Sequence, residues 1–265
     1  MPADTLRTFT PIALNDLKDK AELMSRRDRK YVLTTQNLTR FLEYSRQDFD
    51  ILEIDGKRQF SYASHYFDSE ELHTHQDHNK GRRRRIKVRH RHYVDSDLHY
   101  FEVKLKGARN ITQKYRVDVN PDQLMQNDQL HPDFQEFCQN TLRQHGYDDW
   151  PHEFKPSIVV YYDRITLVAK QGDQRITIDN GIAFSESQYL PRHYLNNARW
   201  IVEVKSSTGR TEADRWLLRN RHRHTALCSK YGMGISMLKT RHRRTRFDTV
   251  MRRHFSSHIK IRQDV

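Results

Sequence analysis

Cysteine is scarce in this sequence: the 265 residues include only Cys138 and Cys228. Two isolated cysteines make neither a disulfide framework nor a paired metal-ligand motif, so we expect a reducing, cytoplasmic environment. The sequence also lacks any run approaching the roughly 18 apolar residues that a membrane-spanning helix requires. Its first residues, MPADTLRTFT, have no apolar core of the kind found in signal peptides. We therefore expect no transmembrane segment of the chain's own, while a membrane-protein partner stays compatible with the sequence.

Several catalytic and metal-binding motifs are absent as well. No glycine-rich P-loop occurs, which argues against a Walker-type nucleotidase. The 16 histidines form no H-E-x-x-H or Cys/His motif, and many lie among arginines, as His90, His92 and His222 do. We interpret the histidines as polar surface rather than as a metal site.

Positive charge is what the sequence has in excess. The formal net charge is +13 and the sequence pI is about 9.8. Apolar residues make up only 35% and charged residues 31%, yet aromatic residues reach 11%, which indicates a folded chain rather than a disordered one. This balance favours polyanionic partners, such as nucleic acid, nucleotides, polyphosphate or acidic membrane, without choosing among them.

The tripeptide Glu-Val-Lys occurs twice, at residues 102–104 and 203–205. Because successive side chains of a strand point to opposite faces, Glu102 shares a face with Lys104, and Glu203 shares one with Lys205. The same period of two recurs along much of the chain. It predicts strands at residues 30–34, 60–68, 85–94, 99–107, 113–119, 157–169, 174–179 and 199–207. Helices are expected from residue 11 towards 31 and at 35–49, 131–146 and 211–232, with a polar connection at 69–83.

An antiparallel sheet with one solvated face explains the alternation of any single strand. The set is unusual because strand after strand puts Arg or Lys on its polar face, and like charges that meet across a sheet repel. A polyanion among them would relieve the repulsion, and a sheet closed into a barrel would place the basic face inside. Phosphoryl transfer needs such positive charge, with a few carboxylates to hold a metal. We predict a single α+β domain, residues 1–265, built on an antiparallel β-barrel with flanking helices.

An ordered set of short motifs carries a family resemblance: DRKYVL, YFDS, KVRHRHY, FEVKLK, QKYRV, YYDR, RITID, VEVKSS and SKYGMG. Together they resemble the VTC domain, the catalytic domain of vacuolar-transporter-chaperone polyphosphate polymerases and their bacterial relatives. This domain belongs to the triphosphate tunnel metalloenzyme, or CYTH, superfamily. The resemblance covers roughly residues 25–240 and leaves a basic, exposed tail at 241–265. It implies a basic β-tunnel that transfers the γ-phosphate of ATP to a growing polyphosphate chain with Mn²⁺ or Mg²⁺.

The resemblance also implies roles for individual residues. Glu203 is similar to the metal-binding glutamate of the family, and Lys205 and Glu102 lie on the tunnel-facing side of their strands. The catalytic residues implied are Lys30, Arg89, Arg91, Lys104, Lys114, Arg164 and Lys230, with Arg116, Arg175 and Lys205 binding substrate.

Two positions depart from the family pattern. Asp28 replaces a glutamate, which is a mild change. Leu227 stands where the eukaryotic enzymes carry a further lysine, and its presence affects how substrate would be bound and whether polyphosphate would be made. Lys230 has a simpler reading as a cation at a helix C-terminus. Two alternatives to a polymerase stay open: a metal-dependent triphosphatase or short-chain polyphosphatase of the same fold, and a non-catalytic module that binds polyphosphate or nucleic acid. We expect no specific nucleic-acid partner.

Overall fold

The computed structural model describes residues 3–20, 27–107, 112–147, 149–150, 153–207, 210–239, 245–255 and 260–262. Its helices are α1 (Ala3–Arg7), α2 (Leu14–Lys20), α3 (Thr35–Ser45), α4 (His73–Lys80), α5 (Pro132–Gln144), α6 (Glu212–Arg219), α7 (Lys230–Leu238) and α8 (Arg246–Phe255), with a 3₁₀ turn at Pro121–Gln123. The longer strands are β2 (Arg27–Thr34), β4 (Phe60–Asp68), β5 (Arg85–Tyr93), β6 (Leu98–Lys106), β7 (Thr112–Asp118), β10 (Lys155–Ala169), β11 (Arg175–Ser185) and β13 (Arg199–Ser206). Shorter strands are β1 (Pro11–Ile12), β3 (Phe49–Leu52), β8 (Met125–Gln126), β9 (Gln129–Leu130), β12 (Arg192–Tyr194) and β14 (Lys260–Arg262).

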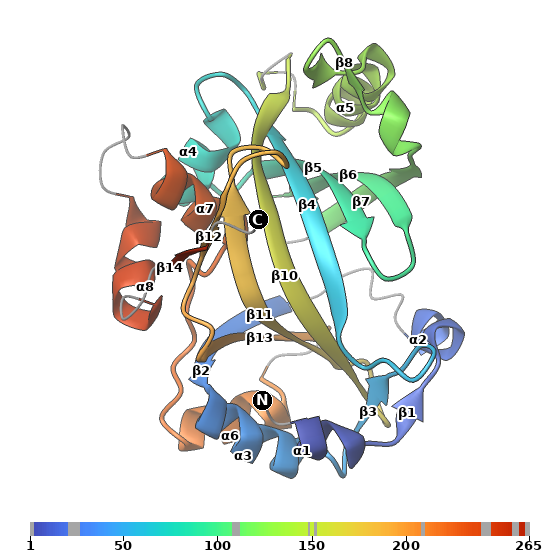
Figure 1. The fold of residues 1–265 in the computed structure, drawn as a ribbon, viewed down its shortest axis with the longest axis vertical. Coiled ribbons are helices and arrows are strands. Elements are labelled where there is room, and N and C mark those ends of the chain that lie inside the picture. Colours follow the sequence, from blue (N-terminus) through green and yellow to red (C-terminus); the bar gives the residue numbers. More distant parts are fainter. Residues whose placement is uncertain are drawn as a thin grey trace.

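One large antiparallel sheet organises the fold. Its long strands pair in the order β2–β13–β11–β10–β4–β5–β6–β7, and every one of these pairings is antiparallel. The sheet curves strongly: β11 runs alongside the long pair β4 and β10, β5, β6 and β7 turn away from that pair, and β13 and β2 cross below it (Figure 1). Among the described residues no backbone pairing joins β2 to β7, but Lys104 of β6 comes within 3.9 Å of Asp28 of β2. The predicted fold class, an α+β barrel-like antiparallel sheet with flanking helices, is confirmed.

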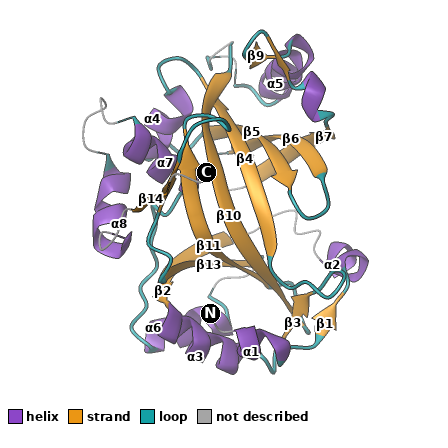
Figure 2. Cartoon of the chain, viewed as in Figure 1, coloured by secondary structure: helices purple, strands orange, loops and turns teal. Residues whose placement is uncertain are grey.

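Two apolar clusters cover the outer, convex face of the sheet. Helix α3 begins at Thr34, whose hydroxyl accepts a hydrogen bond from the backbone N–H of Asn37, and it buries Leu38, Phe41 and Leu42 completely. These side chains pack with apolar residues of β2, β10, β11 and β13, and α6 joins the same cluster. The second cluster lies between α5 and the outer faces of β4, β5 and β6. Figure 2 shows these helices at opposite ends of the sheet.

A third cluster lies on the inner, concave face at one end of the sheet. Helix α7 packs there on β10 and β11, with Gly234 against Ile158 and Phe184, and α8 packs on α7. Four expectations from the sequence are corrected here. The helix expected from residue 11 towards 31 is α2, at Leu14–Lys20, and residues 27–31 belong to strand β2. The helix predicted at 211–232 is two helices, α6 and α7, the polar connection at 69–83 contains α4, and the supposedly exposed tail contains α8. The tail is helical because Phe247, Val250 and Phe255 form a buried stripe at helical spacing. Residues 21–26, 240–244 and 256–259 of the predicted elements lie outside the described residues.

The described helices include none that is long and apolar enough to cross a membrane.

The contact between α7 and α8 can be tested at Gly232. A Cβ built on Gly232 would lie 2.5 Å from two ring atoms of Phe247, a fully buried side chain with no room to retreat. We expect Gly232→Ala to lower the free energy of unfolding by about 1–2 kcal/mol, because the overlap outweighs the gain in helix propensity. Chemical denaturation measures this. Lys239→Ala, at the end of the same helix, is the matched control with an expected effect below about 0.5 kcal/mol. A stabilised Gly232→Ala would contradict the packing described.

Candidate functional site

The concave face of the sheet carries the basic residues, and strand register sets how they pair. Four carboxylates on this face lie directly opposite a base on a neighbouring strand: Asp28 opposite Lys205, and Glu203 opposite Lys30. The same holds for Asp179 opposite Arg164, and for Glu102, which lies between Arg89 and Arg116 on its two neighbours. Because side chains directly opposite each other are close, this register allows the ion pairs of Glu203 with Lys30, Asp179 with Arg164 and Glu102 with Arg89.

Glu102 is the centre of the first group, on β5, β6 and β7. Its carboxylate is only 1% exposed; it accepts a hydrogen bond from Arg89 Nε at 2.7 Å and another from Lys114 Nζ at 2.7 Å. Burial alone would raise the pKa of Glu102, but Arg89, Arg91 and Lys114 outweigh burial and hold this pKa far below its ordinary value. Glu102 is therefore a permanent anion that fixes two cations in place.

Asp179 is the centre of the second group, where β10, β11 and α7 meet. Arg164 donates from Nε and Nη2 to the two carboxylate oxygens at 2.6 and 2.9 Å, a bidentate pair, and Lys230 contacts the same carboxylate. The Lys230 ammonium also lies 4.4 Å from the centre of the Tyr162 ring. Lys230 is the first residue of α7, so its interpretation as a cation at a helix C-terminus is wrong.

Glu203 is the centre of the third group, on β2, β11 and β13. Lys30 Nζ lies 3.3 Å from one carboxylate oxygen and Lys205 Nζ 3.2 Å from the other, and the Thr177 hydroxyl donates at 3.4 Å. Burial would raise the pKa of Glu203, yet Lys205 and Lys30 keep it well below the ordinary value. In return, Glu203 raises the pKa of Lys30 although burial acts to lower it.

Lysines also meet one another on this face. Lys87, Lys104 and Lys114 lie directly opposite in a row across β5, β6 and β7. Among the described residues Lys87 has no carboxylate partner; its ammonium donates to the Ser229 hydroxyl at 3.1 Å. Burial, followed by the charges of Lys30 and Lys104, lowers the pKa of Lys87 well below its ordinary value. Lys87 differs in this from its two neighbours, since Lys114 pairs with Glu102 and Lys104 lies 3.9 Å from Asp28.

The remaining predicted residues lie on the same face. Arg91 is 8% exposed, its Nε is buried without a hydrogen-bond partner, and its guanidinium lies 5.7 Å from the Tyr62 ring centre. Arg116 lies 4.7 Å over the Tyr100 ring. Arg175, at the start of β11, is directly opposite Lys205. The structure thus brings all the predicted site residues onto one concave face; their roles stay predictions.

Two residues of this face were missed from the sequence as site residues. Lys87 and Asp179 both lie on the polar side of strands that the sequence predicts. The alternation of polar and apolar residues along these strands was enough to place both side chains on this face. The alternation did not predict which residues these side chains contact. Asp179, for example, contacts Lys230 because helix α7 packs beside it. Leu227, where the family resemblance implies a lysine, is half-buried and packs against the apolar cluster under α7.

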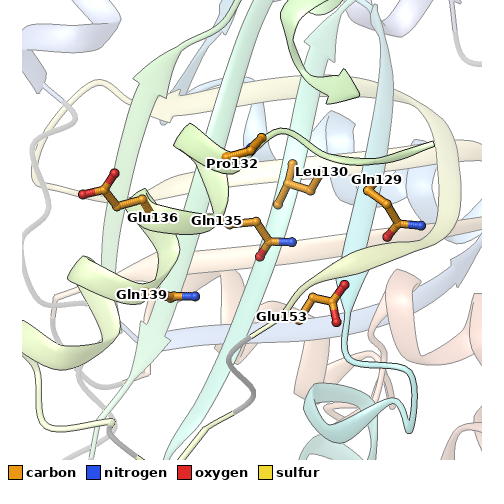
Figure 3. Close-up of a pocket in the computed structure, with 7 residues that line it drawn as sticks. All are labelled: Gln129, Leu130, Pro132, Gln135, Glu136, Gln139 and Glu153. Atoms are coloured by element: carbon orange, nitrogen blue, oxygen red, sulfur yellow. The ribbon is translucent and has the colours of Figure 1, made fainter. Parts of the chain in front are cut away.

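A surface pocket beside α5 lies apart from these groups. Figure 3 shows its lining, which contains no lysine or arginine: Gln129, Leu130, Pro132, Gln135, Glu136, Gln139 and Glu153. It has no feature that suits a polyanion.

The family model of the VTC domain matches residues 25–239, most of the chain and all the groups described above. The chain belongs to the VTC domain family. This confirms the resemblance carried by the short motifs. A search of curated proteins finds no match.

Solved structures of similar shape share little sequence with the chain. A proposed adenylate cyclase from Bacillus halodurans is 10% identical, with 75% of this chain and 89% of that one covered and a TM-score of 0.44. A proposed adenylyl cyclase from Hippeastrum, described as having a dominant triphosphatase activity, is 12% identical, with coverage of 81% and 96% and a TM-score of 0.46. A proposed adenylate cyclase from Vibrio parahaemolyticus is 11% identical, with coverage of 75% and 84% and a TM-score of 0.38.

The lowered pKa of Lys87 gives a pH prediction. An anion favours the charged ammonium, so tripolyphosphate binding should take up a proton at Lys87. The affinity for tripolyphosphate should therefore fall with rising pH in the range between two values: the pKa of Lys87 in the free protein and its higher pKa in the complex. Calorimetry in buffers of different ionisation enthalpy measures the uptake, and Lys87→Met should remove that part of it.

Arg91→Met is the control for this experiment. The pKa of Arg91 is raised even though burial acts to lower it, so its guanidinium is charged before and after binding. Arg91→Met should weaken binding without changing proton uptake. Equal uptake in Lys87→Met and the native protein would show that Lys87 does not titrate on binding.

Proposed function

We propose that this VTC domain is a polyphosphate polymerase that transfers the γ-phosphate of ATP to a growing polyphosphate chain on its concave basic face. The observation that supports this most is the charge of that face: the lysines and arginines that adjacent strands place on it outnumber its carboxylates, and Glu102, Asp179 and Glu203 are each already held by two cations. Polyphosphate and the triphosphate of ATP are anions with repeated negative charge, which such an excess of bases fits.

The proposed reaction breaks the bond between the γ-phosphorus and the β,γ-bridging oxygen of ATP, and ADP leaves with that oxygen. A terminal phosphate oxygen of the chain forms the new bond to the γ-phosphorus. Negative charge spreads over the transferring oxygens during this step, and lysine and arginine donors placed around it stabilise the transition state. Arg89 and Arg164 are held rigidly by Glu102 and Asp179, so we assign them the positioning of phosphate oxygens.

A divalent cation, Mn²⁺ or Mg²⁺, fits this face only together with phosphate. Glu203 is surrounded by Lys30, Lys205 and Thr177, and no group of three His, Cys, Asp or Glu ligands gathers at Glu203 among the described residues. Magnesium-like ions are commonly held by one or two carboxylates plus substrate phosphates. We propose that Glu203 supplies the protein ligand and that the ion supplies further charge neutralisation to the phosphates.

We propose that residues 1–265 form a single tunnel domain with its core at about residues 25–240, and that the basic segment 241–265 attracts polyanions.

Leu227 favours a second candidate function. In place of the lysine that the family resemblance implies, an apolar side chain packs into the cluster under α7, which removes one cation from the site. A metal-dependent triphosphatase or short-chain polyphosphatase uses the same charge around the transferring phosphoryl group, with water in place of the acceptor chain.

A single incubation separates these functions. The purified protein with ATP and Mn²⁺ should produce ADP and a ladder of polyphosphate on a gel, because the acceptor oxygen is that of another phosphate chain. Glu203→Gln should abolish the ladder by removing the carboxylate while keeping the side-chain shape. Glu136→Gln, in the pocket beside α5, is the matched control and should leave the ladder unchanged.

Other products would redirect the assignment. Orthophosphate without a ladder would identify the hydrolase and overturn the polymerase. Tight polyphosphate binding that survives Glu203→Gln, with no product, would identify a binding module. If duplex DNA bound as tightly as polyphosphate and with a steep salt dependence, the concave face would be a general polyanion surface.

A further inference from the structure

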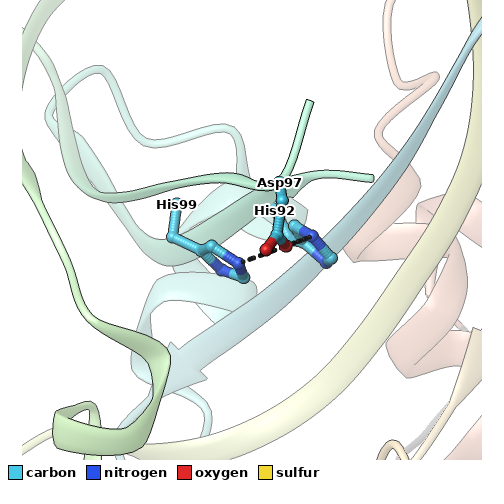
Figure 4. Close-up of side chains that lie close together, drawn as sticks. All are labelled: His92, Asp97 and His99. Atoms are coloured by element: carbon cyan, nitrogen blue, oxygen red, sulfur yellow. Dashed lines mark hydrogen bonds and ion pairs between the residues drawn. The ribbon is translucent and has the colours of Figure 1, made fainter. Parts of the chain in front are cut away.

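The hairpin of β5 and β6 brings together histidines that are separated in the sequence. His92 and His99 lie directly opposite each other near the end of the hairpin, and their rings stack with centroids 4.0 Å apart and planes 11° apart. Asp97, in the turn between the strands, has a positive φ of 49°. This left-handed conformation is one that aspartate tolerates better than most residues. Figure 4 shows the Asp97 carboxylate lying against both rings.

Both rings direct the same nitrogen at the same carboxylate. His92 Nε2 lies 2.9 Å and His99 Nε2 3.1 Å from Asp97 Oδ1, and the three ligand atoms all lie within 4.8 Å of one another. Two ligands about 2.1 Å from an ion and at right angles to each other are about 3.0 Å apart. The two nitrogen–oxygen spacings therefore suit neighbouring ligands of one ion, and the two imidazole nitrogens lie within 4.8 Å of each other.

A further histidine stands behind the three. His90 Nε2 lies 2.9 Å from His99 Nδ1, and the two rings are parallel within 5°. Metal-bound histidines commonly use the second ring nitrogen for a hydrogen bond that fixes the ring.

We propose that His92, His99 and Asp97 form a site for a borderline divalent transition ion such as Zn²⁺ or Co²⁺. Two imidazole nitrogens and one carboxylate are ligands that such ions prefer, whereas Mg²⁺ and Ca²⁺ prefer oxygen. The Asp97 side chain is 84% exposed, so water completes the coordination. The proposal departs from the interpretation of the histidines as polar surface alone.

The site is separate from the basic face. His92 follows Arg91 and His99 precedes Tyr100, and since side chains alternate along a strand, the histidines lie on the opposite, outer face of the sheet. A bound ion would tie together the end of the hairpin that carries Arg89, Arg91 and Glu102 on its other face. The proposal does not depend on the reaction proposed above.

Direct metal binding tests the site. The protein, expressed without a histidine tag and freed of metal with a chelator, is titrated with Zn²⁺ by calorimetry and with Co²⁺ by visible absorption. We expect about one equivalent of Co²⁺ to give ligand-field bands of a nitrogen- and oxygen-coordinated ion. His92→Gln and His99→Gln should each weaken binding at least about tenfold. If either fails to fold by circular dichroism, Asp97→Asn, at an exposed turn, replaces it with the same expected loss.

Two matched variants separate this site from other metal binding. His131→Gln removes another histidine that lies beside a carboxylate, Asp133, but in a lone pair, and Glu136→Gln removes an exposed carboxylate of the pocket beside α5. Both should bind Zn²⁺ as the native protein does. Equal losses in His131→Gln, unchanged affinity in His92→Gln and His99→Gln, or no binding to the native protein would each overturn the proposal.

Discussion

Repulsion among cations on the concave face is the constraint around which the structure is arranged. Lys87, Lys104 and Lys114 lie side by side on adjacent strands, where like charges directly opposite each other are destabilising. The fold holds the lysines there because β5 and β6 bury apolar residues on the outer face of the sheet. A shift of the strand register by one residue would expose that core. The apolar clusters thus impose the charge arrangement, and the carboxylates limit its cost.

Buried ion pairs explain how the site stays rigid without explaining why the protein is stable. Removing charges from water is costly, so a pair such as Arg164 with Asp179 is weak evidence of net stabilisation. Its value is positional: a bidentate guanidinium and a carboxylate have one good geometry. Lys87 is the contrasting case, since no carboxylate fixes or neutralises it and burial shifts its pKa downward. An anion that enters meets fixed arginines at some positions, and at another a lysine whose pKa is lowered by burial.

The alternation of residues predicted the sheet and the composition of its faces because period two is a local property of a strand. The strand register and the packing of helices on the sheet depend on contacts between residues far apart in the sequence, so the sequence did not predict them. Parity placed Asp179 on the polar face, but only the packing of α7 on β10 and β11 makes Lys230 its partner. The tail was read as exposed because its charges outnumber its apolar residues, whereas the spacing of Phe247, Val250 and Phe255 decides its burial. His92 and His99 looked scattered because the turn between them, not their spacing, brings them together.

The choice between transfer and hydrolysis depends on what occupies the position in line with the leaving oxygen. Cations stabilise the transferring phosphoryl group in the same way for both nucleophiles, so the basic face alone does not discriminate. A phosphate chain is itself an anion, and holding it beside the triphosphate requires cations beyond those that bind the triphosphate. Water requires none. The excess of bases over carboxylates on the concave face therefore favours an anionic acceptor. Leu227 acts in the opposite direction, because it packs into the apolar cluster at a position where the family resemblance implies a lysine. The balance between transfer and hydrolysis depends on how many bases remain for the acceptor chain once the triphosphate is bound. The bases on β5, β6 and β7 are the ones that we expect to decide it.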